Sequence, residues 1–83
     1  MTELLIKLPI GQKAFIKSIN TDYVTKERLE SLGMIEGVAI TNIRNSPLGN
    51  PRVYKCLNTL VALRNEIAKQ ITVEVPDKHE QRN

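Results

Sequence analysis

The chain is poor in the residues that most often carry catalysis, metal binding or cross-links. Its 83 residues include one cysteine, one histidine, two tyrosines, one phenylalanine and no tryptophan. A single cysteine cannot form an internal disulfide, so packing alone must hold the fold, as is usual in a reducing compartment. No apolar run approaches the roughly 20 residues needed to cross a bilayer, and no signal segment opens the chain. We therefore expect a cytoplasmic protein that meets a membrane only through a partner.

The few candidate ligands and nucleophiles are badly spaced for a reactive site. Cys56 falls on a predicted strand and His79 in the C-terminal segment, whereas a metal centre needs converging ligands. A nucleophile needs a base beside it, and the lone histidine does not supply one. The spacing of Gly33 and Gly37 lacks the Gly-Lys-Ser/Thr that completes a phosphate-binding loop. We expect no catalytic residue, no metal ligand and no cofactor.

The charge balance is basic, with 12 lysine and arginine residues against nine aspartate and glutamate residues and a net charge of +3. A basic balance raises the alternative of a small nucleic-acid-binding barrel. Proteins that bind single strands stack bases on aromatic side chains, of which this chain has few, and its densest basic pair is Lys26 with Arg28. We therefore expect no nucleic-acid partner.

Length and composition predict one small domain. At this size only about 60 to 65% of the unfolded chain's surface can be buried, so the core must be thin. We place the domain at residues 1–76. Residues 77–83 contain no apolar side chain and are expected to form a disordered tail.

Capping residues at both ends predict a short helix. Thr25 suits the N-cap position, where its hydroxyl can accept from a free backbone amide, and the helix then runs over residues 26–32. Gly33 suits the position just after the helix, because glycine enters the left-handed region without a Cβ clash. Met34 can then cover Leu29. A two-turn helix is marginal alone in water, so Leu29, Leu32 and Met34 are predicted to pack on a sheet.

Strands are predicted around this helix. Gly37 marks the turn from the helix into the next strand. Alternating or apolar runs predict five strands over 13–19, 38–44, 52–57, 60–63 and 71–75. Residues 2–9 do not decide between helix and strand, and Asn65 is predicted to cap one helical turn. Short strands joined by turns favour a closed or nearly closed barrel, because closure removes exposed edges.

The connection between the second and third of these strands is the candidate contact surface. It reads Asn-Ser-Pro-Leu-Gly-Asn-Pro over residues 45–51, a composition typical of a hairpin loop. Its prolines limit the freedom that binding would remove, so a projecting Leu48 could contact a partner at low entropic cost. The predicted contact residues are Pro47, Leu48, Gly49 and Pro51. The alternative is that Leu48 folds back and closes one end of the barrel.

Four segments in series resemble the FeoA family. They are L-P-I-G at residues 8–11, R-L-E-S-L-G-M-I-E-G at 28–37, S-P-L-G-N-P at 46–51 and V-A-L-R at 61–64. The resemblance spans nearly all of residues 4–75. It implies a mainly β fold, an SH3-like barrel of about five antiparallel strands with one short α-helix inserted after the first strand.

The resemblance also implies a function. Members of the FeoA family are small cytoplasmic, non-enzymatic accessory proteins of ferrous-iron uptake, and they act on the cytosolic GTPase region of the FeoB-type membrane transporter. Related barrels form a C-terminal domain in iron-dependent repressors, which raises the further alternative of a metal-sensing SH3-like domain. The residues before the first predicted strand contain no helix-turn-helix pattern, so we expect the stand-alone form.

Overall fold

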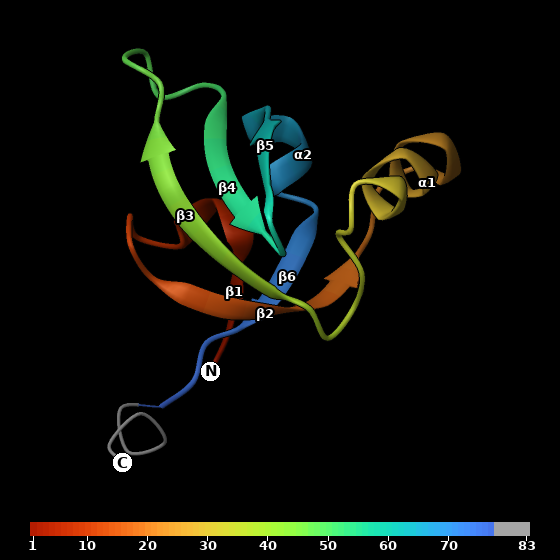
Figure 1. Cartoon of the computed structure of the whole chain (residues 1–83), viewed down its shortest axis with the longest axis horizontal. Coiled ribbons are helices and arrows are strands. Elements are labelled where there is room, and N and C mark those ends of the chain that lie inside the picture. Colours follow the sequence, from red (N-terminus) through yellow and green to blue (C-terminus); the bar gives the residue numbers. More distant parts are fainter. Residues whose placement is uncertain (78–83) are drawn as a thin grey trace.

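The structure, a computed structural model, describes residues 1–77, and these form six strands, two α-helices and one 3-10 turn (Figure 1). The strands are β1 (Thr2–Leu4), β2 (Lys13–Ile19), β3 (Ala39–Asn45), β4 (Arg52–Cys56), β5 (Thr59–Leu63) and β6 (Ile71–Glu74). The helices are α1 (Tyr23–Ser31) and α2 (Asn65–Ala68), and the 3-10 turn η1 is Leu5–Lys7. Within this part of the chain no helix is long and apolar enough to cross a membrane. The expected C-terminal tail lies outside the described residues apart from Asp77.

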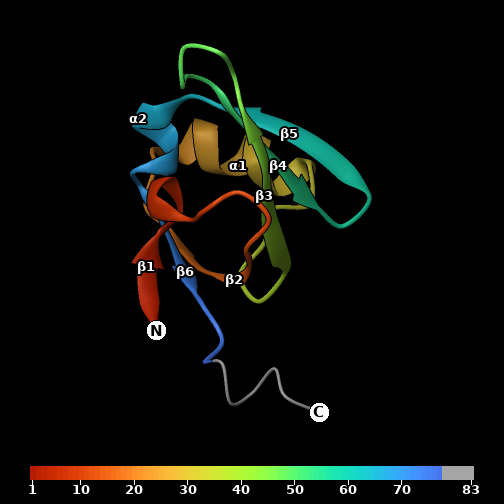
Figure 2. The ribbon, with the colours of Figure 1, turned by 90° about the vertical axis from the view of Figure 1, so that its left-hand side faces the viewer.

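All neighbouring strands in the described sheet are antiparallel, in the order β1-β6-β2-β3-β4-β5 (Figure 2). The sequence predicts five strands, and that count is wrong by one because β1 pairs with β6 from Thr2 opposite Glu74 to Leu4 opposite Thr72. A strand of three residues that passes directly into η1 is too short to show alternation. The inserted helix consequently follows the second strand rather than the first.

One continuous core fills the space inside the coiled sheet. In β2 the side chains alternate between exposed and buried, which confirms the predicted strand, and Ala14 and Ile16 face the core. The buried apolar residues are Leu5, Leu8, Ala14, Ile16, Ile19, Leu29, Met34, Ile40, Tyr54, Cys56, Val61, Leu63, Ala68, Ile71 and Val73. These residues come from both halves of the chain, so the described residues fold as one unit.

The helix α1 begins earlier than the sequence predicts. Its N-cap is Asp22, whose carboxylate accepts from the Thr25 backbone N–H at 2.9 Å. Thr25 was therefore misplaced as the cap: it lies inside the helix, and its hydroxyl donates to the other oxygen of Asp22 at 2.9 Å. These hydrogen bonds to Thr25, first the backbone bond, lower the pKa of the Asp22 carboxyl. Aspartate competes better than threonine for this position because both of its oxygens accept.

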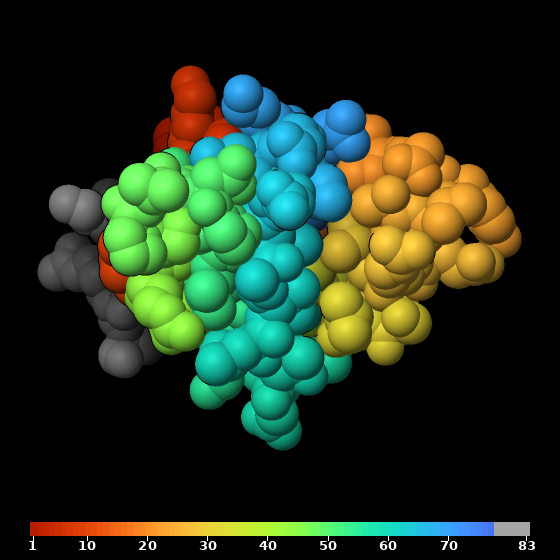
Figure 3. All heavy atoms as spheres, turned by 90° about the horizontal axis from the view of Figure 1, so that it is seen from above, coloured from red at the N-terminus to blue at the C-terminus, as the bar shows by residue number. Residues whose placement is uncertain are grey.

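The C-terminal end of α1 matches the sequence prediction. Gly33 has a φ of +96°, and its N–H donates to the Glu30 carbonyl at 3.0 Å. The Met34 N–H donates to the Leu29 carbonyl at 3.1 Å, which completes a Schellman motif, and both of these side chains are buried. The prediction that Leu32 packs in the core is wrong, because it is 41% exposed. The chain reverses at Gly33, and α1 projects from the barrel with only Leu29 buried (Figure 3).

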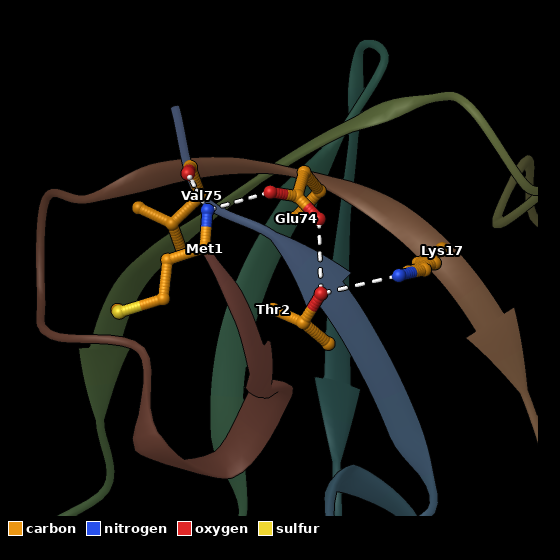
Figure 4. A network of polar contacts seen from close by, with 5 residues as sticks. All are labelled: Met1, Thr2, Lys17, Glu74 and Val75. Carbon is orange, nitrogen blue, oxygen red and sulfur yellow. Dashed lines mark hydrogen bonds and ion pairs between the residues drawn. The ribbon is translucent and has the colours of Figure 1, made fainter. Parts of the chain in front are cut away.

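A polar network joins the start of β1 to the end of β6, which lie side by side at one end of this antiparallel pair (Figure 4). The Met1 ammonium group donates to Glu74 Oε2 at 2.5 Å and to the Val75 carbonyl at 2.7 Å. Thr2 Oγ1 donates to Glu74 Oε1 at 3.0 Å and accepts from Lys17 Nζ at 3.1 Å. The hydrogen bond from the Met1 ammonium group, followed by the one from Thr2, lowers the pKa of the Glu74 carboxyl below its ordinary value of 4.5.

This network should make stability depend on pH. Because the pKa of Glu74 is lower in the folded than in the unfolded protein, its contribution is present above pH 4.5 and is lost as the pH falls through the folded-state value. We expect Glu74→Gln to lower the melting temperature at neutral pH and to flatten its decline on acidification. Melting curves at a series of pH values test this. The matched control is Glu66→Gln, outside the network, and an equal flattening in both variants would contradict the assignment.

Candidate contact surface

The loop between β3 and β4 is a short, internally bonded turn that projects beyond the sheet (Figure 1). The Ser46 N–H donates to the Pro51 carbonyl at 3.1 Å, and the Gly49 N–H donates to the Ser46 carbonyl at 2.8 Å. Gly49 has a φ of +79°, a conformation that glycine adopts without strain, and the Asn50–Pro51 peptide bond is cis. The two strands that it joins pair antiparallel, which confirms the predicted hairpin.

A side chain from elsewhere in the chain fixes this loop. Asn65 donates from Nδ2 to the Gly49 carbonyl at 3.1 Å, and its backbone N–H donates to Asn50 Oδ1 at 3.0 Å. The guanidinium of Arg52 donates to Asn65 Oδ1 at 3.3 Å and to Asn45 Oδ1 at 3.1 Å. We call Asn45, Asn50, Arg52 and Asn65 the loop clamp. The clamp ties both sides of the loop to the start of α2.

The loop clamp corrects one prediction. Asn65 does not cap α2 as the sequence suggests, because Arg64 occupies the N-cap position and makes no side-chain capping bond. The amide of Asn65 is engaged by the loop instead. Nothing local in the sequence distinguishes an asparagine that caps its own helix from one that binds a distant loop. The clamp was therefore missed, although the asparagines on either side of the loop are typical of side-chain-to-backbone bonding.

Leu48 stands at the tip of the loop and is 93% exposed. The alternative that it closes one end of the barrel is therefore wrong. Pro47 is exposed, while Gly49 and Pro51 are half-buried beneath the tip. The structure brings these four predicted contact residues together on one projection. The other singled-out residues serve the fold: Leu29 and Met34 lie in the core, and Gly33 and Gly37 have the positive φ angles of turns.

The candidate reactive side chains Cys56 and Tyr54 are both buried and hydrogen-bonded within the fold. The Cys56 thiol is buried and donates to the Gly33 carbonyl at 3.4 Å, and desolvation raises its pKa. Burial likewise raises the pKa of the Tyr54 hydroxyl, which donates to the Leu5 carbonyl at 3.5 Å. In residues 1–77 no three His, Cys, Asp or Glu side chains gather as a metal site. His79 lies outside this part of the chain.

The described residues thus form a curled antiparallel sheet with one inserted helix and a projecting hairpin loop. Residues 4–75 match the FeoA domain family. The chain belongs to the FeoA family. The resemblance carried by the four sequence segments is thereby confirmed, and it covers the same part of the chain.

Three relatives illustrate the family. A Porphyromonas gingivalis protein, the Fe(2+) transport protein A/Fe(2+) transporter FeoB fusion protein, is 32% identical over 71 residues, which are 86% of this chain but 8% of that protein. The solution structure of FeoA from Chlorobium tepidum is 29% identical, with a TM-score of 0.86 over 93% of this chain and 76% of that one. FeoA from Stenotrophomonas maltophilia, complexed with zinc and described as an SH3 domain protein, is 28% identical with a TM-score of 0.74 over 89% of each chain. The SH3-like fold is confirmed.

Proposed function

We propose that this FeoA-family chain is a non-enzymatic accessory protein of ferrous-iron uptake that binds and regulates the cytosolic GTPase region of a FeoB-type membrane transporter. The observation that carries the proposal is the Porphyromonas gingivalis relative, in which a region similar to this chain is part of one polypeptide with the transporter FeoB. Fusion gives two domains a high effective concentration, which favours a functional contact between them. The chain spans 8% of the length of that protein.

The projecting loop has the properties of a contact surface for this partner. Leu48 presents an apolar side chain to solvent, and such residues anchor interfaces when a partner pocket desolvates them. The loop clamp and the two prolines hold the loop in one conformation, so little conformational entropy remains to be lost on binding. The loop therefore supports binding without any further ordering step.

Leu48→Asp tests the loop. Because Leu48 is 93% exposed, the variant should keep the melting temperature of the parent. Its affinity for the purified GTPase region of the transporter should fall by about 1 to 2 kcal/mol, the scale of an interface anchor. Isothermal titration calorimetry, carried out in the nucleotide-free, GDP-bound and GTP-analogue states, measures the loss and shows which state the protein recognises.

Ile10→Asp is the matched control. Ile10 is also apolar and 60% exposed, but it lies between η1 and β2 rather than in the loop. It should leave affinity unchanged. An equal loss in both variants would show that added negative charge, not the loop, weakens binding. A stable Leu48→Asp variant with full affinity would remove the loop from the contact surface, and no binding by the parent in any nucleotide state would contradict the proposed function itself.

A further inference from the structure

A second surface lies on the outer face of the sheet. The inward-facing residues of β2 to β5 are buried, so the residues that alternate with them point outward. Lys13 on β2 is opposite Thr41 on β3, Thr41 is opposite Lys55 on β4, and Lys55 is opposite Leu60 on β5. Residues directly opposite one another share a face of the sheet. We call this set of four the outer row.

The outer row carries positive charge that no described carboxylate neutralises. Lys13 and Lys55 are exposed, and neither forms an ion pair with an acidic residue among those described. They lie two strand spacings apart, about 10 Å. The carboxylate nearest in register is that of Glu74 on β6, which lies opposite Phe15 on β2. This carboxylate is already paired with the Met1 ammonium group. The field of the two lysines is thus directed at solvent.

Apolar side chains flank these charges. Phe15, two residues from Lys13 on the same face, is 37% exposed, and the Lys13 ammonium group lies 5.7 Å from its ring centroid. Leu60 ends the row on β5 and is 58% exposed. The row thus combines two separated cations and a central hydroxyl with apolar side chains on both sides, so it can make charged and apolar contacts to the same partner.

We propose that the outer row is a docking surface for an acidic face of a protein partner, with Lys13 and Lys55 meeting carboxylates while Phe15 and Leu60 make apolar contacts. The register places the row several residues along β3 and β4 from the loop that joins them, so it is a contact surface separate from Leu48. Lysine ammonium groups are point charges that do not bind phosphate in the bidentate geometry of arginine. A single-stranded nucleic acid would also call for several stacking aromatic side chains, and the row has one beside it.

Binding of poly-L-glutamate by the intact chain at low ionic strength tests the proposal. We expect Lys13→Gln with Lys55→Gln to weaken binding about fivefold, the scale of two exposed ion pairs. The matched control is Lys7→Gln with Lys69→Gln, which removes the same charge from exposed lysines on η1 and next to α2. Since all four side chains are exposed, both double variants should fold normally, which melting curves confirm. An equal loss of affinity in the two double variants would mean that binding depends only on the net charge of the protein, and would overturn the proposal.

Two further measurements complete the test. Amide chemical shifts in a titration with poly-L-glutamate should change mainly around residues 13, 15, 41, 55 and 60, and changes centred elsewhere would overturn the proposal. Single-stranded DNA and phosphatidylcholine vesicles containing phosphatidylserine are the competing probes. Weaker binding of both than of poly-L-glutamate supports a protein partner. Tighter binding of either, with the same sensitivity to Lys13→Gln and Lys55→Gln, would assign the row to that ligand instead.

Discussion

Replacing Leu29 with alanine should lower the free energy of unfolding by about 2 to 5 kcal/mol, the range measured for buried leucines. Leu29 is 4% exposed and is the one buried side chain of α1. Its removal eliminates apolar contact between the helix and the barrel and leaves a cavity that the short helix can fill only by shifting. In a domain of this size such a loss is a large part of the total stability, so we expect a measurable unfolded fraction at 25 °C.

Leu32→Ala is the matched control for this prediction. It deletes the same atoms from a leucine that lies at the end of the same helix but is 41% exposed. Urea denaturation should show a much smaller change in midpoint for Leu32→Ala than for Leu29→Ala, with similar slopes for both. Similar losses in the two variants would mean that helix stability, rather than burial of one side chain, holds α1 in place.

Gly33→Ala should also destabilise the protein strongly, for two separate reasons. The φ of +96° is a conformation that residues with a Cβ rarely adopt, and the strain of a left-handed residue is about 1 to 2 kcal/mol. A Cβ at this position would in addition approach Leu57 Cδ1 to 2.9 Å, so this exposed side chain must move, which adds a smaller cost than the backbone strain. Thermal or urea denaturation measures the combined loss.

Two further variants separate these contributions. Gly37 has a similar φ of +92° but has no atom within 4 Å of the added Cβ, so Gly37→Ala should show the backbone strain alone. Leu57 is 61% exposed, and Leu57→Ala in the Gly33→Ala background should relieve the steric part and bring the double variant close to Gly37→Ala. If Gly33→Ala is no worse than Gly37→Ala, the contact between the helix end and the β4–β5 turn is not rigid.

The sequence predicts the parts of this fold that depend on neighbouring residues. Gly33 and Met34 terminate α1 as expected because the Schellman motif is local. The start of the helix was harder to predict, since Asp22 and Thr25 are both capping residues and only the structure shows which of them accepts the free amides. Leu32 was misassigned because helical spacing places it near Leu29, whereas the contact of α1 with the barrel is narrower than a full helical face.

In the candidate surfaces, too, the features set by neighbouring residues are predictable from the sequence, and those set by distant contacts are not. The hairpin follows from the composition of residues 45–51, but that composition does not decide whether Leu48 projects or folds back, and the structure shows it exposed. The bonds that hold the loop come from Asn65, whose partner no local pattern reveals. The outer row depends on strand register, which brings Lys13 and Lys55 onto one face from distant parts of the sequence. A linear search for basic clusters finds Lys26 and Arg28 and misses this pair. Long-range pairing is the information that single-sequence reasoning does not contain.

The loop clamp has a consequence for how the hairpin can vary and be transferred. The shape of the loop is encoded in two places, the hairpin itself and the first residue of α2. Grafting residues 45–52 onto another two-stranded scaffold would transfer Leu48 without Asn65. The side-chain amide of Asn65 holds the Gly49 carbonyl, and its backbone N–H holds the Asn50 side chain. Conversely, Leu48 can be replaced without loss of the clamp. The four hydrogen bonds join the Arg52 guanidinium, the asparagines and the Gly49 carbonyl, and none involves Leu48. The fold thus separates a constant frame from an interchangeable tip, an arrangement in which recognition can change without changing the barrel.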